Sequence, residues 1–359
     1  MGCNATVLAA FQQGQLGFGI SDAGWLMPWY FGVLYALQKL GIVTPGVTPI
    51  GGVSGGSVAA ASSCLGLDFP SQVLPAVEAA AEQCRTTNLC AGNLHSVMDP
   101  TLKALLLPAA SNATALARCK ANTQIYVSEG QPVISIQPAS LLLMRAASVQ
   151  IKGSRPQLID KSNAEGFVDG IVANWFIPYY WSRFGAWSTT YRGQPAYEGY
   201  FTRPMPCPTN SKLCIRVSSR YPGPLCAKDK LYDFFVRPFY LTPNQPLYPQ
   251  PADIHPGKYT KCKYTPMDLS ARLSITPGSR EDLQYLFDLG KADGAAWAAD
   301  VGLTNPAACQ AAAAAAALAD AAAGAAAVPA AAPAAAAEGE QGDGAAGDAA
   351  AAPGTALGR

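Results

Sequence analysis

A serine flanked by glycines is the side chain of this sequence best suited to covalent chemistry. Residues 52–56 read Gly-Val-Ser-Gly-Gly, a G-x-S-x-G pattern that follows the apolar stretch 47–53 and precedes the helix-compatible run Val-Ala-Ala-Ala at 58–61. On a sharp turn between a strand and a helix, small neighbours leave room for a substrate carbonyl, and the first amides of the helix favour a developing negative charge. The pattern also fits an ordinary glycine-rich turn in a chain with 34 glycines. The spacing predicts Ser54 as a nucleophile for acyl transfer.

Alternating strand-like and helix-like segments predict the fold that would hold this serine. A short strand at 16–21 precedes a helix at 28–40, in which Trp29, Val33 and Leu37 recur at helical spacing, and a second strand follows at 48–53. This order places parallel strands in one sheet that helices cover. The further expected elements are a hairpin of strands at 124–128 and 133–136, a helix at 164–176, a strand at 212–217 and a helix that opens at 278–282.

Composition limits the classes of protein that this chain can belong to. Hydrophobic residues make up 50% of the 359 residues and charged residues 14%, so a large buried core is feasible. The net charge of +1 gives no basic surface, which excludes nucleic acid as an expected partner. No apolar run is long enough to span a bilayer, and no cleavable signal peptide is evident. We expect one folded domain at 12–300 and an alanine-rich, low-complexity tail at 301–359 that is disordered apart from a transient helix at 310–323.

Ten cysteines leave the redox state, and with it the cellular compartment, open. No Cys/His spacing typical of a zinc site occurs, so no metal is expected. Two glycosylation sequons, which begin at positions 4 and 112, have meaning only in the secretory pathway. The cysteines are either disulfides or buried free thiols, and those nearest in sequence are Cys84/Cys90 and Cys207/Cys214/Cys226.

Four segments together resemble the patatin-like phospholipase family, most strongly its adipose triglyceride lipase branch. Residues 22–34 resemble the family's glycine-rich oxyanion loop and the helix after it, and residues 52–56 resemble its nucleophile elbow. Residues 164–180 resemble a helix that ends in Phe-Ile-Pro, and residues 197–206 resemble the segment that carries the family's acid. The resemblance implies a three-layer α/β/α sandwich with a mostly parallel central sheet, a Ser–Asp dyad without histidine, and no cofactor. It also implies an acylglycerol or phospholipid substrate, met at a membrane or lipid-droplet surface.

Two acids compete for the role of general base. Glu198 stands where the family places its aspartate, although glutamate is longer by one methylene, which displaces the carboxylate by about 1 Å or more, enough to cost on the order of a hundredfold in rate. Asp169, followed by glycine, is the second candidate, but it falls within the expected helix at 164–176 and can be a polar surface residue. The only histidines, His95 and His255, lie in loop-like sequence and are not expected to act.

The oxyanion loop departs from the family's G-x-G-x-x-G pattern. Asp22 and Met27 stand where the first and last glycines would be, and Asp22 would repel an oxyanion if it pointed inward. Backbone amides are the expected donors, so the side chains matter mainly through the shape of the loop. The expected residues of the elbow and oxyanion site are Gly24, Leu26, Met27, Gly52, Gly55 and Gly56.

The favoured function is a serine-dependent lipid acyl hydrolase, either an acylglycerol lipase or a phospholipase. The departures at Asp22, Met27 and Glu198 leave a weakened or inactive lipid-binding or regulatory relative as an alternative. An acyl transferase would use the same acyl-enzyme with another acceptor. Aromatic residues at 25–31 and 175–187 would either line an acyl groove or pack in the core. We expect a cytoplasmic protein at a membrane or lipid-droplet surface, with the secretory pathway left open.

Overall fold

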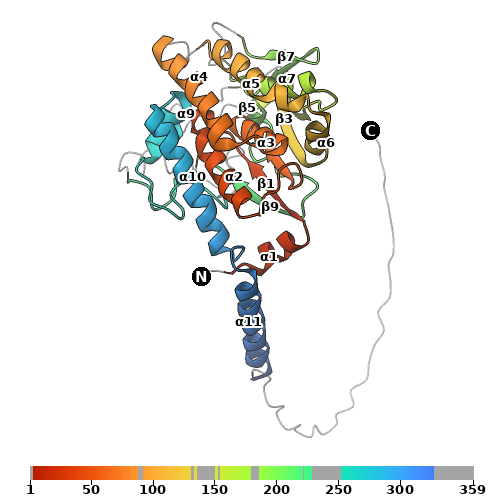
Figure 1. Cartoon of the computed structure of the whole chain (residues 1–359), viewed down its shortest axis with the longest axis vertical. Coiled ribbons are helices and arrows are strands. Elements are labelled where there is room, and N and C mark those ends of the chain that lie inside the picture. Colours follow the sequence, from red (N-terminus) through yellow and green to blue (C-terminus); the bar gives the residue numbers. More distant parts are fainter. Residues whose placement is uncertain are drawn as a thin grey trace, which may run out of the picture. The chain divides into compact units, whose positions relative to one another are not determined.

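The computed structural model describes residues 3–87, 92–130, 133–135, 150–152, 154–178, 186–220, 222–228 and 252–326. The chain divides into two compact units, Met1–Ala313 and Ala314–Arg359. The first unit is a mixed α/β fold built around a seven-stranded sheet (Figure 1). Every residue of the candidate site lies in this first unit.

The centre of the sheet is parallel, as the alternating sequence predicts. The strands follow the order β7-β8-β3-β2-β1-β9, with β6 also paired to β3. Strand β1 (Leu16–Ile20) pairs in parallel with β2 (Ile50–Gly52) and with β9 (Leu213–Val217), and β2 pairs in parallel with β3 (Thr123–Glu129). The antiparallel strands are β6 (Arg155–Leu158), β7 (Thr189–Tyr191) and β8 (Gln194–Tyr197), and they join beyond the parallel part.

The predicted hairpin of strands at 124–128 and 133–136 is wrong. The first half of β3 pairs with β2, and its second half, Tyr126–Glu129, pairs with β6 and β8. Both edges of β3 are therefore occupied by strands distant in sequence. The segment Val133–Ser135 instead forms β4, which pairs with β5 (Gln150–Lys152) in a separate two-stranded sheet. Its apolar pattern suits a strand but does not identify the partner.

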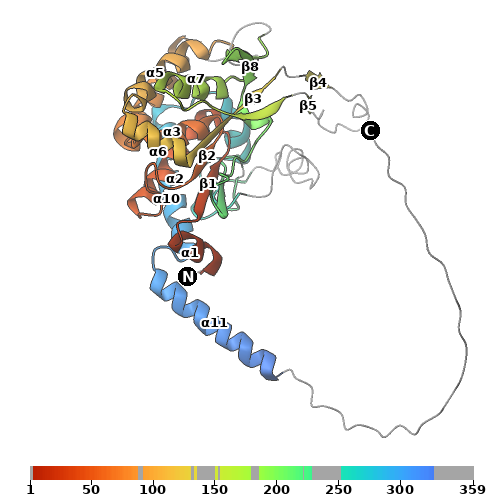
Figure 2. The ribbon, with the colours of Figure 1, turned by 90° about the vertical axis from the view of Figure 1, so that its right-hand side faces the viewer.

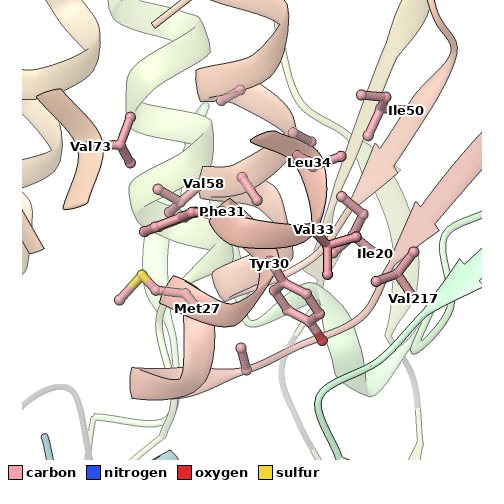
Figure 3. Packing of buried hydrophobic residues seen from close by; sticks show 14 of the residues in the cluster. Ile20, Met27, Tyr30, Phe31, Val33, Leu34, Ile50, Val58, Val73 and Val217 are labelled. Atoms are coloured by element: carbon pink, nitrogen blue, oxygen red, sulfur yellow. The ribbon is translucent and has the colours of Figure 1, made fainter. Parts of the chain in front are cut away.

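The helices bury one apolar layer against the parallel strands. Figure 2 shows α2 (Met27–Lys39), α3 (Gly55–Leu65), α6 (Ala113–Asn122) and α10 (Arg280–Asp300) on the same side of β1 and β2. Tyr30 and Val33 of α2 lie beside Ile20 of β1 and Val217 of β9 (Figure 3), and all four are nearly or fully buried. Helix α2 fixes the end of β1, and α3 starts from the end of β2, so this packing positions the loops that carry the candidate site.

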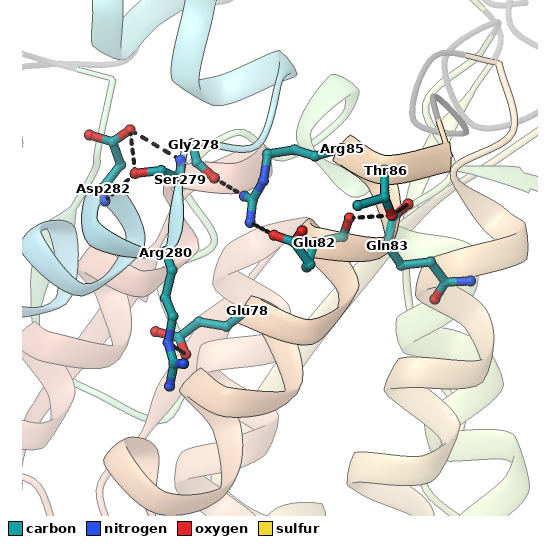
Figure 4. Close-up of polar contacts among 9 residues, drawn as sticks. All are labelled: Glu78, Glu82, Gln83, Arg85, Thr86, Gly278, Ser279, Arg280 and Asp282. Carbon is teal, nitrogen blue, oxygen red and sulfur yellow. Dashed lines mark hydrogen bonds and ion pairs between the residues drawn. The ribbon is translucent and has the colours of Figure 1, made fainter.

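Helix α10 starts where the sequence predicts and is fastened to a neighbouring helix. Ser279 caps it by accepting from the Asp282 amide, and Asp282 accepts in return from the Ser279 amide. Arg280 forms an ion pair with Glu78 of α4 (Leu74–Thr87) at 3.1 Å, and Arg85 of α4 donates to the carbonyl of the residue before Ser279 (Figure 4). These contacts hold α10 against the helical layer.

The remaining elements connect or flank these layers. They are α1 (Ala5–Gln12), α5 (His95–Ala110), α7 (Ala164–Asn174), α9 (Leu273–Ile275) and α11 (Pro306–Ala326), with the short turns η1 (Gly24–Leu26), η2 (Phe69–Val73), η4 (Gly199–Phe201) and η6 (Asp268–Arg272). In the described part of the chain, no helix has both the length and the apolar composition that crossing a bilayer requires.

Three disulfides join described cysteines: Cys3–Cys309, Cys64–Cys119 and Cys207–Cys214. Cys226 and Cys262 are free and buried, so Cys226 does not join the neighbouring pair. The other pairing considered, Cys84 with Cys90, includes a residue outside the described ranges. Cys309 is 4% exposed, so the folded unit continues past residue 300, where the sequence places the start of the tail. The helix expected at 310–323 is part of α11.

Candidate active site

Three neighbouring strands end at the same level of the sheet, and each delivers one polar side chain beyond its end. Ile20, the last residue of β1, pairs with Gly52 of β2 on one side and with Val217 of β9 on the other. Asp22, Ser54 and Arg220 follow these strand ends. The carboxyl ends of parallel strands are where α/β folds place their reactive groups, because the chain leaves the sheet there in loops of adjustable shape.

Ser54 occupies the sharp turn that its glycine neighbours predict. Its backbone has φ 50° and ψ −129°, a conformation that a residue with a side chain adopts at an energetic cost of about 1–3 kcal/mol. Helix α3 begins at the next residue, and the Ser54 carbonyl accepts a 2.6 Å hydrogen bond from the Ser57 hydroxyl. The strained turn directs the serine away from the regular strand and helix, as a nucleophile elbow requires.

A buried asparagine holds this turn in place. The Ser54 amide donates to Oδ1 of Asn174, and Nδ2 of Asn174 donates to the carbonyl of Tyr126 in β3. Asn174 is the last residue of α7 and is fully buried. One side chain thus connects the elbow, the sheet and α7, and it consumes the Ser54 amide. Sequence reasoning missed Asn174, since a single Asn at a helix end carries no signal of a partner 120 residues away.

Glu198 reaches the same place from the antiparallel side of the sheet. It directly follows β8, its amide donates to the carbonyl of Phe176 at 2.9 Å, and its carbonyl accepts from the Ser128 hydroxyl at 2.7 Å. Its side chain lies close enough to the Ser54 hydroxyl for the two to interact. Ser54 Oγ nevertheless makes no hydrogen bond of normal length and angle to any described residue. Catalytic hydrogen bonds are often this loose before substrate binds.

The surroundings of Glu198 favour its neutral form. Glu198 is 5% exposed, and loss of solvation, followed by the nearby Asp22 carboxylate, raises its pKa to about 8. The Ser54 hydroxyl and the Arg220 guanidinium oppose this shift by stabilising the carboxylate. A carboxyl with a pKa near neutrality is a suitable proton acceptor and donor for acyl transfer.

The loop after β1 packs directly on the elbow. Gly24 has φ +54°, and a Cβ there would lie 2.0 Å from the carbonyl oxygen of Ser274, so only glycine fits. A Cβ on Gly55 would lie 2.8 Å from that of Ala23 and 3.1 Å from that of Met27. Gly24 therefore lets the loop pack against the backbone of Ser274, and Gly55 lets the elbow pack against the loop. A Cβ on Gly52 would lie 2.4 Å from the carbonyl oxygen of Gly56, so Gly52 lets the two ends of the elbow approach each other, whereas a Cβ on Gly56 would lie 2.3 Å from the carbonyl oxygen of Ser21, which directly follows β1.

Only some of the expected oxyanion donors are available. The Leu26 amide donates to the Ala23 carbonyl at 3.2 Å, and the Met27 amide donates to the Gly24 carbonyl, so both are used within the loop. The amides of Gly24 and Gly55 make no hydrogen bond to a described backbone or side-chain acceptor. Gly55 is the first residue of α3, where amides have no partner within the helix. The candidate donors therefore narrow to Gly24 and Gly55.

Asp22 points into the protein but does not stand there as a lone charge. It is fully buried and forms an ion pair with Arg220, whose Nε donates to one carboxylate oxygen and whose terminal nitrogen Nη2 lies in ion-pair contact with the same oxygen. The Ser21 hydroxyl donates to the other oxygen at 3.0 Å. Arg220 was not among the residues expected from the sequence, because its partner is 198 positions away.

The structure does not bring Asp169 to Ser54. Asp169 lies on α7, is about half exposed and forms a 3.0 Å ion pair with Lys103. It lines a surface cavity of about 340 Å³ together with residues of the β7–β8 hairpin. Ser54 Oγ also makes no hydrogen bond to an imidazole among the described residues. His95 begins α5, and His255 follows Ile254, which bridges to β9.

The aromatic segments contribute chiefly to the core. Trp25, Trp29, Phe31 and Trp175 are each at most 1% exposed, and Trp29 donates to Asp293 at 3.0 Å. Residues 179–185 of the second segment lie outside the described ranges. Among described residues, no group of three or more histidine, cysteine or acidic side chains is arranged to hold a metal ion.

Comparison with known protein families finds no family that matches this sequence, and comparison with curated proteins finds no relative.

Proposed function

We propose that this chain is a serine-dependent lipid acyl hydrolase, built on a patatin-like three-layer α/β/α sandwich. The observation that carries the proposal is the meeting of three features at one sheet edge: the strained Ser54, the buried carboxyl of Glu198 and the two unused amides of Gly24 and Gly55. A nucleophile, a proton acceptor and oxyanion donors are the parts that acyl transfer requires. The resemblance to patatin-like phospholipases points to an acylglycerol or phospholipid, met at a membrane or lipid-droplet surface.

In the proposed reaction Glu198 moves a proton twice. As Ser54 Oγ attacks the ester carbonyl carbon, the Glu198 carboxylate takes the hydroxyl proton, and the amides of Gly24 and Gly55 hold the negative oxygen. Glu198 then gives the proton to the departing alcohol oxygen, and the acyl-enzyme remains. In the second half Glu198 takes a proton from the water that attacks the acyl carbon. It then gives this proton to Ser54 Oγ as the acyl–oxygen bond breaks, which releases the fatty acid and restores the free serine hydroxyl.

Hydrolysis is expected to rise with pH across the range near pH 8. The base must be ionised to accept a proton, and burial raises the pKa of Glu198 to about 8. Below this value most molecules carry a neutral Glu198, so kcat/KM falls about tenfold for each pH unit further down. A pH profile of nitrophenyl ester hydrolysis, corrected for spontaneous hydrolysis, tests this expectation. An acid limb with its midpoint near pH 4.5 would contradict it, because that is the ordinary carboxyl value.

A fluorophosphonate probe tests the proposal most directly. We expect covalent labelling of the full-length chain, with the phosphonyl group located on Ser54 by peptide mass spectrometry, because the probe reports an activated serine beside oxyanion donors. Competition by an emulsified triacylglycerol or by phospholipid vesicles would then indicate which lipid class enters the site. Labelling elsewhere, with Ser54 unmodified, would reject the assignment of the nucleophile.

The alternative is a lipid-binding or regulatory protein that no longer hydrolyses esters. Two observations favour it: Ser54 is fully buried, and glutamate replaces the aspartate of the resembled family. This alternative predicts no labelling of Ser54 while the protein still binds lipid vesicles or droplets. The same probe experiment therefore separates the two functions.

A further inference from the structure

We infer that Arg220 is a positioning residue: by pairing with Asp22 it fixes the start of the oxyanion loop and cancels a buried negative charge beside Ser54 and Glu198. The inference rests on the proposed function, since it concerns the same site. It also explains how an acid can stand where the resembled family has the first glycine of its loop.

The pair joins two parallel strands at their carboxyl ends. Asp22 follows β1 and Arg220 follows β9, whose last residues pair in register. Arg220 Nε donates to one carboxylate oxygen of Asp22 and Nη2 makes an ion-pair contact with the same oxygen, while the guanidinium lies 5.5 Å from the ring centre of Tyr200, two residues beyond Glu198. Guanidinium groups stack on aromatic faces while they hydrogen-bond in their own plane. Arg220 is thus held on two sides, with 29% of its side chain exposed.

A second connection ties the same two strand ends together. The Tyr30 hydroxyl donates to the Asp22 carbonyl at 2.8 Å and accepts from the Ser219 amide at 3.0 Å. The backbone on either side of the ion pair is therefore fixed by α2. The side chain of Asp22 cannot turn toward the substrate without breaking its bonds to Arg220 and to the Ser21 hydroxyl. Ala23 and Gly24 follow at once, so this arrangement sets where the candidate oxyanion donor begins.

The charges around Glu198 form a small group with opposed effects. The groups that act on its carboxyl are Asp22 from the end of β1, Arg220 from the end of β9 and Ser54 from the elbow. Asp22 favours the neutral form of Glu198, and Arg220 and Ser54 favour the ionised form. Two tyrosines are the other titratable neighbours. Tyr200 interacts electrostatically with the Arg220 guanidinium, and the Asp22 carboxylate helps to raise the pKa of Tyr30. Without the positive charge of Arg220, the Asp22 carboxylate should raise the pKa of Glu198 further. Without the negative charge of Asp22, the Arg220 guanidinium should lower the pKa of Glu198.

The test compares variants of the full-length chain in which one or both charges are removed at nearly constant size. Arg220→Gln is expected to move the titration midpoint of Glu198 upward by about one pH unit, and Asp22→Asn is expected to move it downward by a similar amount. The double variant Asp22→Asn/Arg220→Gln should return close to the wild type. Arg220→Lys keeps the charge but loses the fork, so it should leave the midpoint near the wild-type value and lower the rate. The control is Arg216→Gln. Arg216 belongs to β9, the strand that precedes Arg220, and this substitution breaks its 3.3 Å ion pair with Asp253.

Two readouts keep this inference separate from the proposed function. The first is the acid limb of the pH profile of ester hydrolysis. The second is an infrared titration of the protonated carboxyl band that disappears in Glu198→Gln, which needs no activity. If infrared shows opposite shifts of the Glu198 midpoint in the two single variants while the protein hydrolyses no ester, the inference about Arg220 and Asp22 is supported and the proposed hydrolase function is rejected. Identical midpoints in Arg220→Gln, Asp22→Asn and the wild type would overturn the inference whatever the activity, and melting temperatures show that each variant is folded.

Discussion

Replacing Ser54 by alanine is expected to lower kcat for ester hydrolysis by at least about 10⁴-fold and to abolish fluorophosphonate labelling. The loss is this large because no other described hydroxyl occupies the turn beside Glu198 and the free amides. The fold should persist, because Ser54 Oγ makes no hydrogen bond of normal geometry to a described residue. Alanine keeps the Cβ and therefore the same backbone strain, so the melting temperature should stay close to that of the wild type. Rates on a short-chain nitrophenyl ester and on triolein, with a melting curve, check both statements.

The helix that follows Ser54 offers a matched control for this variant. Ser62 of α3 is fully buried, and its hydroxyl also makes no hydrogen bond of normal geometry to a described residue. Ser62→Ala should keep wild-type hydrolysis and labelling. Ser57 is less suitable, because its hydroxyl supports the carbonyl of Ser54. If Ser54→Ala hydrolysed both substrates as fast as Ser62→Ala does, the proposed mechanism would be wrong.

Glu198→Gln is expected to lower kcat by about 10²–10⁴-fold while the substrate KM changes little. Glutamine keeps the size and the hydrogen bonds of the neutral acid but cannot take the Ser54 proton. Glu198→Asp, in contrast, keeps a carboxylate that can accept the proton. It restores the residue type of the resembled family, so we expect hydrolysis at the wild-type rate or faster. An Asp169→Asn variant is the control, because Asp169 pairs with Lys103 on the surface and should be dispensable.

Glu198→Gln is also expected to change the stability of the fold in a pH-dependent way. The folded-state pKa of Glu198, about 8, lies above its ordinary value of 4.5, so the folded protein holds a proton that the unfolded chain releases in this interval. Stability therefore decreases as pH rises from the lower value to the upper one. Glutamine stays neutral throughout, so Glu198→Gln should melt higher than the wild type at pH 9 and equally at pH 4. An unchanged difference between the two proteins at both pH values would show that Glu198 is not a buried neutral acid.

The sequence predicts those features whose determinants are local. The turn at Ser54 follows from glycines on both sides, helix α2 follows from its apolar spacing, and the start of α10 follows from Ser279 as its cap. Glu198 comes from a different source: its position relative to segments of a resembled family identifies it, and no local pattern does. In the fold its carboxyl lies near the Ser54 hydroxyl.

The features that the sequence leaves hidden depend on contacts between distant segments. Asn174 and Arg220 each look like ordinary polar residues, and their importance comes from partners that only folding supplies. Asp22 is the instructive case. Its charge argues against an oxyanion site when only the loop is considered, and the opposite charge that neutralises it lies 198 residues further along the chain, after the strand β9 that pairs with β1. Similarly, the apolar pattern of β3 shows a strand but cannot name its neighbours.

The Cys3–Cys309 bridge brings the two ends of the folded unit to within 5.3 Å between Cα atoms. A domain whose termini lie close together tolerates circular permutation, because its core packing does not depend on where the chain begins. A peptide linker in place of the bridge would make the polypeptide continuous there, and new termini could be opened in an exposed connection such as the turn at Gly41. Such a circular permutant would keep every strand neighbour described here. The order in which the segments leave the ribosome would change, while the sheet edge that carries Ser54 stays the same.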